Sequence, residues 1–454
     1  MSPDKVVILD GTPLGDQRLE PVLGTLTGII GRTGAQIETF ALRFIKLAHC
    51  LGCFECWVRT PGMCVEADAN RDIARAVVNC DTLVLFTPVT FGGYSPELKR
   101  FVDHMIQIIL PTFELRNGEL HHPPRYARLP RLIVVGVQHE PNKEEALIFR
   151  VLAGRNALNM RPPSYAAEVV SSGEATSALE RCFRSLLTRV NEIPSRASVT
   201  ALMPAPATSD APVSPERRGR ALLIVGSPKV KRPSTSGVLG GYLLDRLKER
   251  GWETELLTLR ASLGREDGQL ELLAATNRAE LIVLAFPLYV DALPFLMTKA
   301  LTVLAAHRAR ISDVPPQRFV AICNSGFPEA HQNSLALAIC RRFAVASRMT
   351  WAGALALGAG EALSSGRPLE AKNRQGPPVK HVMQALRITG AALAEGRPVP
   401  AEAVALMAKN PVPLPFAVWQ WMFAKIGARG FRRQALGYGV SKKQMFDRPY
   451  AGAA

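Results

Sequence analysis

Four cysteines crowd into one short segment near the start of the chain, and their spacing could hold a metal centre. Cys50, Cys53, Cys56 and Cys64 follow the pattern C-x2-C-x2-C-x7-C. Three thiolates separated by two residues can surround one centre from a single turn, and a fourth can complete the set, as in ferredoxin-type clusters. Zinc is the main alternative because four cysteines also satisfy its tetrahedral coordination, and unligated thiols are another. The equal spacing favours an iron-sulfur cluster over the paired cysteines usual for zinc.

A loop rich in hydroxyl groups in the second half of the chain could bind a phosphate group. It follows the apolar run 221–225 and leads into a helical pattern of apolar residues that begins at Leu239. A helix N-terminus offers free N–H groups and the positive end of its dipole to an anion. We predict a phosphomonoester site here; an ordinary N-cap cluster is the alternative. The polar residues of this loop are Ser227, Lys229, Lys231, Arg232, Ser234, Thr235 and Ser236.

The corresponding loop of the first half suits an anion less well. It has Thr12 at the place of Ser227, but it also contains Asp16 and Glu20, which only Arg18 offsets. These carboxylates would repel a phosphate dianion. The sequence therefore predicts that this phosphate site is weakened or lost.

Further loops could contact a planar ring. A turn that begins with proline and contains an aromatic residue follows the third predicted strand of each half, and such a turn can lie along a ring while its N–H groups reach the ring's polar edge. A loop after the fourth strand of the second half adds His331 and Asn333 as candidates for ring or substrate contacts. The main candidates are Pro88, Val89, Thr90, Phe91 and Gly92 in the first half, and Pro287, Leu288, Tyr289, Val290, Asn324, Ser325, Gly326 and Phe327 in the second.

The elements that must position these loops form two similar series. Short apolar runs alternate with longer helical patterns, which predicts a parallel sheet covered by helices on both faces. Five strands with intervening helices are the parts of a doubly wound α/β sheet of order 2-1-3-4-5, whose crevice lies beyond the carboxyl ends of strands one and three. The phosphate and ring loops follow strands at that crevice. The predicted strands are 6–9, 36–42, 82–87, 132–137 and 165–170, then 221–225, 253–259, 281–286, 319–324 and 351–357.

A chain of 454 residues is too long for one ordinary core, and recurring landmarks indicate an internal duplication. Gly11-Thr12-Pro13 corresponds to Gly226-Ser227-Pro228, and Gly173-Glu174-Ala175 to Gly360-Glu361-Ala362. We predict a first domain with the cysteines, a linker rich in Pro, Ala and Ser, a second domain, and a helical basic arm. Their bounds are 1–192, 193–218, 219–400 and 401–454.

The net charge of +16 raises the question of a nucleic-acid partner. From Lys409 onward, however, eight basic residues stand against Asp447 alone, and no nucleic-acid-binding signature accompanies them. We therefore expect no nucleic-acid partner. The first residues lack the pattern of a signal peptide, and the longest apolar run, 414–423, is too short to cross a bilayer. We expect a cytoplasmic protein, where clustered cysteines stay reduced.

These features resemble the NAD(P)H-dependent FMN reductase group of flavodoxin-like proteins, and the first half is similar to its iron-sulfur flavoproteins. The resemblance rests on residues 50–64, on the turn 88–93 with 95–101 behind it, and on 226–228 with the Ser-Thr-Ser that follows. It spans about 5–185 and 219–395. It implies two tandem flavodoxin-like domains, FMN held by the three crevice loops, and reduction by NAD(P)H. Electrons would then pass to a quinone, a flavin or a 4Fe-4S cluster.

The resemblance thus implies an FMN-containing NAD(P)H oxidoreductase of the flavin or quinone reductase type. Its partners would be a pyridine nucleotide and a small-molecule electron acceptor, and the flavin would perform the chemistry without a catalytic acid-base pair. Family members of this fold associate in pairs, so we hypothesise that the two copies form an internal pseudo-dimer; a homodimer of the chain is a further option. Two alternatives are an FMN and iron-sulfur electron-transfer protein without NAD(P)H turnover, and a flavin-free scaffold protein.

The segment 411–433 combines aromatic and basic residues, including Trp419 and Trp421. It could lie on an anionic membrane surface. We favour an arm packed across the second domain or a partner chain, because exposed aromatic clusters usually mark a contact.

Overall fold

A computed structural model gives the structure of the chain, and it describes residues 3–205, 219–229, 233–263, 265, 267–364, 366–371, 379–412 and 414–452. The described residues divide into two compact units. Unit 1 comprises residues up to 195 together with 422–452, and unit 2 comprises residues 196–421. Each unit is described by itself.

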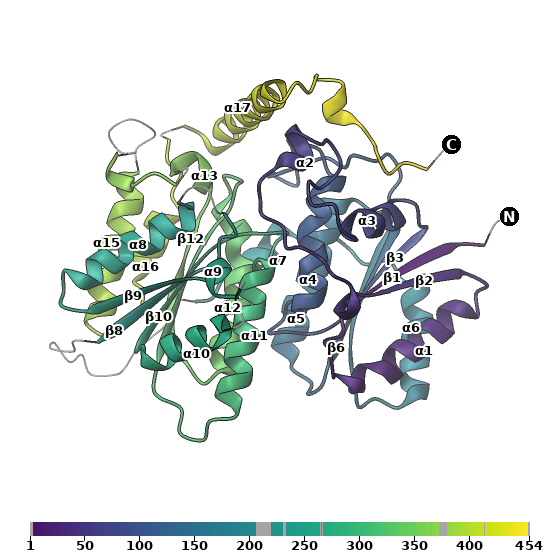
Figure 1. The fold of residues 1–454 in the computed structure, drawn as a ribbon, viewed down its shortest axis with the longest axis horizontal. Coiled ribbons are helices and arrows are strands. Elements are labelled where there is room, and N and C mark those ends of the chain that lie inside the picture. Colours follow the sequence, from purple (N-terminus) through teal and green to yellow (C-terminus); the bar gives the residue numbers. More distant parts are fainter. Residues whose placement is uncertain are drawn as a thin grey trace. The chain divides into compact units, whose positions relative to one another are not determined.

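The sheet of unit 1 has five parallel strands in the order β2-β1-β3-β6-β7 (Figure 1). The central strands are continuous apolar runs, and Ile8, Leu85 and Val134 are fully buried, as expected for a sheet covered on both faces. This confirms the order 2-1-3-4-5 predicted from the sequence. The strands are β1 (Lys5–Asp10), β2 (Gln36–Ala41), β3 (Thr82–Pro88), β6 (Arg131–Gln138) and β7 (Tyr165–Ser171).

The sheet of unit 2 repeats this plan with the order β9-β8-β10-β11-β12, again all parallel. Both sheets therefore have the doubly wound flavodoxin-like topology. The equal order is what a duplication requires; the duplication itself stays a prediction. The strands are β8 (Arg220–Val225), β9 (Glu253–Thr258), β10 (Leu281–Pro287), β11 (Arg318–Asn324) and β12 (Thr350–Leu357).

Helices cover the sheets and connect successive strands. In unit 1 they are α1 (Glu20–Gly31), α2 (Glu55–Val58), α3 (Asn70–Val78), α4 (Pro96–Val102), α5 (Lys143–Met160) and α6 (Thr176–Thr188), with the short helices η1 (Gln17–Leu19), η2 (Leu42–Phe44), η3 (Asp103–Ile108) and η5 (Gln444–Phe446). In unit 2 they are α7 (Arg196–Thr200), α8 (Thr235–Lys248), α9 (Leu259–Leu263), α10 (Gly268–Arg278), α11 (Phe295–Ala309), η4 (Ala330–Asn333), α12 (Ser334–Ala346), α13 (Gly360–Leu363), α15 (Lys380–Ala394) and α16 (Ala401–Met407). The boundary between the units falls within α17 (Phe416–Gly437).

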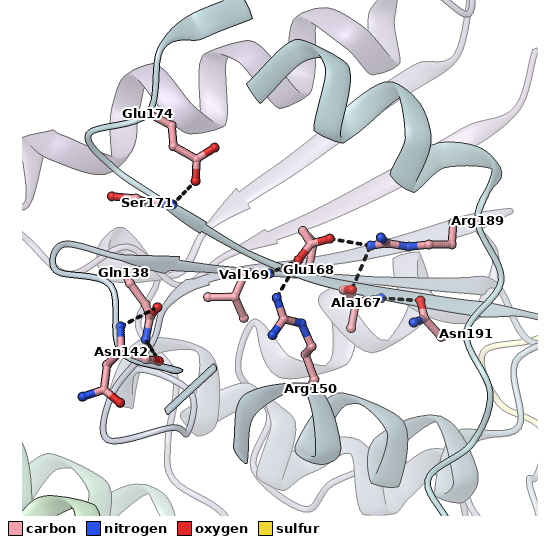
Figure 2. A network of polar contacts seen from close by, with 10 residues as sticks. All are labelled: Gln138, Asn142, Arg150, Ala167, Glu168, Val169, Ser171, Glu174, Arg189 and Asn191. Atoms are coloured by element: carbon pink, nitrogen blue, oxygen red, sulfur yellow. Dashed lines mark hydrogen bonds and ion pairs between the residues drawn. The ribbon is translucent and has the colours of Figure 1, made fainter. Parts of the chain in front are cut away.

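A polar network around Glu168 covers the edge strand β7 (Figure 2). Arg150 of α5 and Arg189 donate to its carboxylate at 2.9 and 2.8 Å, and the N–H of Val169 donates at 2.9 Å. Burial alone would raise the pKa of Glu168, but these hydrogen bonds lower it below its usual value. An edge strand that carries charged, hydrogen-bonded side chains resists pairing with a strand of another molecule.

Several local features differ from the sequence-based expectations. Helix α3 ends at Val78, and Cys80 lies in the connection before β3. The predicted linker contains the short helix α7, whose Val199 is buried and which packs on α12; residues 206–218 lie outside the described part. A small hairpin, β4 (Glu114–Arg116) and β5 (Glu119–His121), was not anticipated.

The C-terminal part of the chain divides between the units. Helix α16 packs on α15 and β12 in unit 2, whereas residues 422–452 belong to unit 1. No helix in the described part of the chain is both long and apolar enough to cross a lipid bilayer.

Candidate functional site

The four clustered cysteines of unit 1 line one pocket that is partly open to solvent. Cys56 is buried, Cys50 and Cys64 are half-buried, and Cys53 is exposed. His104, Ile106 and Gln107 of η3 complete the inner wall; further lining residues are His49, Leu51, Gly52, Phe54, Val65 and Glu66. The structure therefore brings together all four predicted metal ligands.

Two left-handed residues shape the cysteine loop. Gly52 and Phe54 have φ of 60° and 59°, and they turn the chain between Cys50 and the start of α2. At the other end, the N–H of Gly62 donates to the carbonyl of Cys56 at 2.8 Å, so the segment leading to Cys64 folds back on α2. Because the loop is wound in this way, ligands fourteen residues apart in sequence reach the same space.

Burial raises the pKa of all four thiols. The pKa of Cys64 rises to about 11, and that of Cys56 rises well above its usual value, with each neighbouring thiol adding to the effect. Ligation would therefore release protons, because only the thiolate binds metal.

The four cysteines line the same pocket. Among the described residues, no three His, Cys, Asp or Glu side chains are arranged to hold one metal ion. A tetrahedral zinc would require all its sulfur ligands at about 2.3 Å from one centre. An iron-sulfur cluster also takes cysteine thiolates as its ligands, so the four thiols fit the ligand type of either centre.

Hydrogen bonds from η3 fix the loop around Cys64. The side-chain oxygen of Gln107 accepts from the N–H of Cys64 at 3.1 Å, and the Gln107 amide donates to Asn70 at 3.1 Å. Arg71 donates to the carbonyl of Cys64 at 3.0 Å. Neither Gln107 nor Asn70 could be identified from the sequence, because neither belongs to the cysteine motif.

The predicted phosphate loop of unit 2 runs from β8 to the N-terminus of α8. Ser234 caps this helix, since its hydroxyl accepts from the N–H of Gly237 at 3.0 Å. Ser227, Thr235 and Ser236 are nearly fully buried behind it. Lys229 is partly exposed and donates to Glu361 at 2.7 Å. Lys231 and Arg232 lie outside the described residues.

The phosphate loop is tied to the loop after β11. The Ser236 hydroxyl donates to the Asn324 side chain at 2.8 Å. The carbonyl of Ser325 accepts from the N–H of Gly360, and the carbonyl of Phe327 accepts from Ala359. These bonds join the phosphate loop of unit 2 to the segments that follow β11 and β12.

Two residues near this crevice have structural roles. Asn333, a candidate for ring contacts, is fully buried and donates to the carbonyl of Ala330 at 2.9 Å. Its side-chain oxygen accepts from the thiol of Cys323 at 3.1 Å. Asn333 therefore braces the loop from inside.

The turns after β3 and β10 have the same backbone geometry. In each, the first and fourth residues exchange two hydrogen bonds: Thr90 with Gly93 at 2.9 and 2.8 Å, and Tyr289 with Ala292 at 2.9 and 3.1 Å. The two central residues have positive φ in both turns, which defines a type I′ turn. The predicted ring loops are thus equivalent although their side chains differ.

Val290 occupies a strained position in this turn. Its φ of 47° is one that a β-branched side chain rarely adopts. We expect Val290→Asn to raise the free energy of unfolding by about 1 kcal/mol, because asparagine tolerates this conformation. Urea unfolding should show this, and Val290→Ala, which removes branching without favouring positive φ, is the control. Equal stability of the two variants would contradict the strain.

The loop after β1 in unit 1 does not fit a phosphate. Asp10, buried at the end of β1, accepts from the N–H of Thr12 at 2.9 Å and also from its hydroxyl, and it pairs with Arg43. Asp16 contacts the ring of His139 at 2.7 Å. Both donors of Thr12 are thus engaged by a carboxylate. The sequence pointed to Asp16 but missed Asp10, which reads as the last residue of a strand.

His122 packs beside the cysteine loop and should make stability depend on pH. Its ring lies 4.5 Å from that of Trp57, and its Nδ1 lies 2.8 Å from the carbonyl oxygen of Thr112. Burial lowers the pKa of His122 to about 4, below the value of about 6.5 in an unfolded chain. The unfolded chain therefore binds the proton first, and stability is lost as the pH falls from about 6.5 towards 4.

We expect wild type to lose about 2 kcal/mol more unfolding free energy than His122→Phe between pH 7 and pH 4.5. Phenylalanine keeps the ring against Trp57 but takes up no proton. Urea unfolding of both proteins at the two pH values measures the difference. Parallel losses would show that His122 does not carry this pH dependence.

Part of the chain is similar to known proteins. Residues 5–122 match the family described as NADPH-dependent FMN reductase. The chain is 28% identical over 113 residues to an iron-sulfur flavoprotein of Methanocaldococcus jannaschii, covering 25% of this chain and 57% of that protein. It is 25% identical over 113 residues to the iron-sulfur flavoprotein of Methanosarcina thermophila, covering 25% and 58%. The chain thus spans little more than half the length of these relatives.

Solved structures with a similar fold include the NAD(P)H:quinone oxidoreductase from Methanothermobacter marburgensis, at 13% identity and a TM-score of 0.32, over 41% of this chain and 100% of that one. An FMN-dependent NADH-azoreductase from Bacillus anthracis in complex with FMN matches at 14% identity and a TM-score of 0.26, over 39% and 99%. Through residues 5–122, the chain is thus similar to the family described as NADPH-dependent FMN reductase.

Proposed function

We propose that the protein is a flavin-dependent oxidoreductase that takes electrons from NAD(P)H through FMN held by unit 2. The observation that carries the proposal is the hydroxyl-lined loop at the N-terminus of α8, joined by Ser236 and Asn324 to the loop after β11. Hydroxyl donors and a helix N-terminus suit a phosphate dianion. Bound FMN would accept a hydride from a nicotinamide and release electrons singly or in pairs.

Each crevice loop of unit 2 would bind a different part of FMN. Ser227, Ser234 and the hydroxyls that follow would hold the phosphate, with Lys229 adding positive charge. The turn at Leu288–Val290 has its backbone fixed by the bonds between Tyr289 and Ala292, so it offers a rigid edge for a planar ring. The loop at Asn324–Phe327 would close the third side. No acid-base residue is required for this chemistry.

In unit 1 we propose that Cys50, Cys53, Cys56 and Cys64 ligate a 4Fe-4S cluster. The fit rests on four thiols around one pocket, with the loop held from inside by η3. Such a cluster would pass single electrons. Because Cys53 is exposed whereas Cys56 is buried, an acceptor could approach the cluster from the Cys53 side. The acceptor would be a quinone, a flavin or an iron-sulfur centre.

The absorption spectrum of anaerobically purified protein, followed by steady-state oxidation of NADH and NADPH, tests this function. We expect a flavin band, a broad iron-sulfur shoulder and turnover with at least one nucleotide. Flavin without turnover would instead support an electron-transfer protein. A colourless protein that retains no FMN when FMN is offered in excess would exclude the proposal. The remaining alternative would then be a flavin-free scaffold protein.

We also propose that α17 and the segment after it touch an anionic membrane from the cytoplasmic side. Ile426, Leu436 and Tyr438 are 59%, 61% and 53% exposed, and exposed arginines at 429, 432 and 433 lie among them. Exposed apolar and basic side chains on one segment suit a headgroup region. Co-sedimentation with vesicles containing phosphatidylglycerol should fall at least tenfold when the three arginines become glutamine. Unchanged co-sedimentation would exclude this contact.

A further inference from the structure

Arg125 in unit 1 is a buried cation held by carbonyl groups. Its side chain is 1% exposed. One guanidinium nitrogen donates to the carbonyls of Met445 and Asp447, both at 2.9 Å, and Nε donates to the carbonyl of Gln107 at 3.0 Å. Carbonyl dipoles satisfy these donors, but they do not cancel the positive charge, which an arginine keeps in a protein. A buried charge is costly unless an opposite charge compensates it.

Two of these contacts come from residues 445–452, which we call the strap. Besides holding Arg125, the strap reaches the cysteine loop. The Tyr450 hydroxyl donates at 3.0 Å to the same Gln107 oxygen that accepts from the N–H of Cys64. Asn79 donates to the carbonyl of Tyr450 at 2.7 Å and anchors the strap on unit 1. Residues 435–445 also pack on Cys56 and Trp57 in one apolar cluster.

Arg125 lies against the loop that carries Cys56. Its side chain packs against Gly62, and the N–H of Gly62 donates to the carbonyl of Cys56 at 2.8 Å. Four thiolates around an iron-sulfur cluster carry a net negative charge into the same buried region. The guanidinium, on which the Asp447 carboxylate also acts, is therefore placed where an anionic centre would add to its compensation, and it would in turn stabilise that centre.

We propose that the strap completes the cysteine site by holding Arg125 beside Cys56 as a fixed counter-charge to a thiolate-ligated cluster, with Tyr450 and Gln107 as positioning residues for Cys64. The inference rests on the proposed iron-sulfur function of the four cysteines. It predicts that removal of the positive charge makes the midpoint potential of the cluster more negative, because the reduced cluster carries more negative charge than the oxidised one.

The test uses the full chain, purified anaerobically, with iron content, chelator-induced iron release and a redox titration followed by electron paramagnetic resonance. Arg125→Met should release iron at least tenfold faster and lower the midpoint potential. Arg125→Lys keeps the charge and should retain the wild-type potential. The matched control is Arg308→Met in unit 2, where an equally buried guanidinium also donates to carbonyls, including that of Ser347. In this control variant the midpoint potential of the cluster should equal that of wild type.

Tyr450→Phe is the second variant, and it serves even where Arg125→Met fails to fold. It should release iron about threefold faster at an unchanged potential, because it removes one hydroxyl and no charge. The proposal is overturned when wild type holds iron but Arg125→Met keeps the wild-type potential, when Arg308→Met shifts it equally, or when Tyr450→Phe releases iron at the wild-type rate. A wild-type protein without iron overturns the proposed cluster function, and the counter-charge role with it.

Discussion

Replacing Cys56 by serine is expected to lower the iron content at least tenfold and to abolish the broad visible absorption of the cluster. Cys56 is the most buried of the four candidate ligands, at 7% exposure, and it belongs to an apolar cluster with Trp57 and Val58. Serine preserves the size of the side chain but lacks the soft thiolate that iron-sulfur clusters require. Iron and acid-labile sulfide per polypeptide measure the loss, with FMN content recorded in the same samples.

Two other cysteines supply controls for this loss. Cys182 on α6 is half-buried, and Cys80 is 5% exposed, and both lie outside the pocket. Serine at either position should leave the iron content within about a fifth of wild type. A Cys56→Ser protein that keeps its iron would remove Cys56 from the ligand set, and equal losses in all three variants would indicate general unfolding.

Reversing the charge of Lys229 is expected to weaken FMN binding about 30-fold, equivalent to about 2 kcal/mol, in the range measured for hydrogen bonds to charged groups. Lys229 lies in the loop before α8, and its present partner Glu361 is 54% exposed, so the fold does not depend on this pair. In Lys229→Glu a carboxylate would face the phosphate dianion. Riboflavin, which has no phosphate, should bind both proteins equally. Flavin fluorescence titration measures both affinities.

Lys248→Glu is the matched control for this variant. Lys248 is exposed at the other end of α8, so the change in net charge is the same but its position is not. Its affinity for FMN should stay within twofold of wild type. If Lys229→Glu binds FMN as tightly as Lys248→Glu does, the phosphate does not bind at this loop.

The strand order and the position of the loops could be predicted because they depend on local pattern. Continuous apolar runs such as 82–87 identify strands buried on both faces, and parallel strands of known order must bring their carboxyl ends together. The cysteine motif is equally local, since three of its members lie within seven residues. The prediction that the phosphate loop of unit 1 is weakened agrees with its structure, where Asp10 engages Thr12.

The surroundings of the cysteines could not be predicted, because they depend on distant backbone groups. Arg125 binds the carbonyls of residues more than 300 positions away, and every residue type offers a carbonyl. For the same reason, nothing in the sequence connects Tyr450 with Cys64. Asp10 was missed because a single polar residue at the end of an apolar run reads as a strand end. The sequence predicted corresponding turns after β3 and β10, but not their shared type I′ conformation, because Phe91-Gly92 and Val290-Asp291 have no residue type in common.

The bond between Gln107 and Tyr450 joins positions 343 residues apart, with unit 2 between them in the sequence. A ribosome that adds about 5 to 20 residues per second needs roughly 20 to 70 seconds to make that stretch. The nascent chain therefore exposes the thiols long before their covering residues emerge. The site can therefore be completed only after unit 2 has been translated. Until then the cysteine thiols are exposed to oxidation.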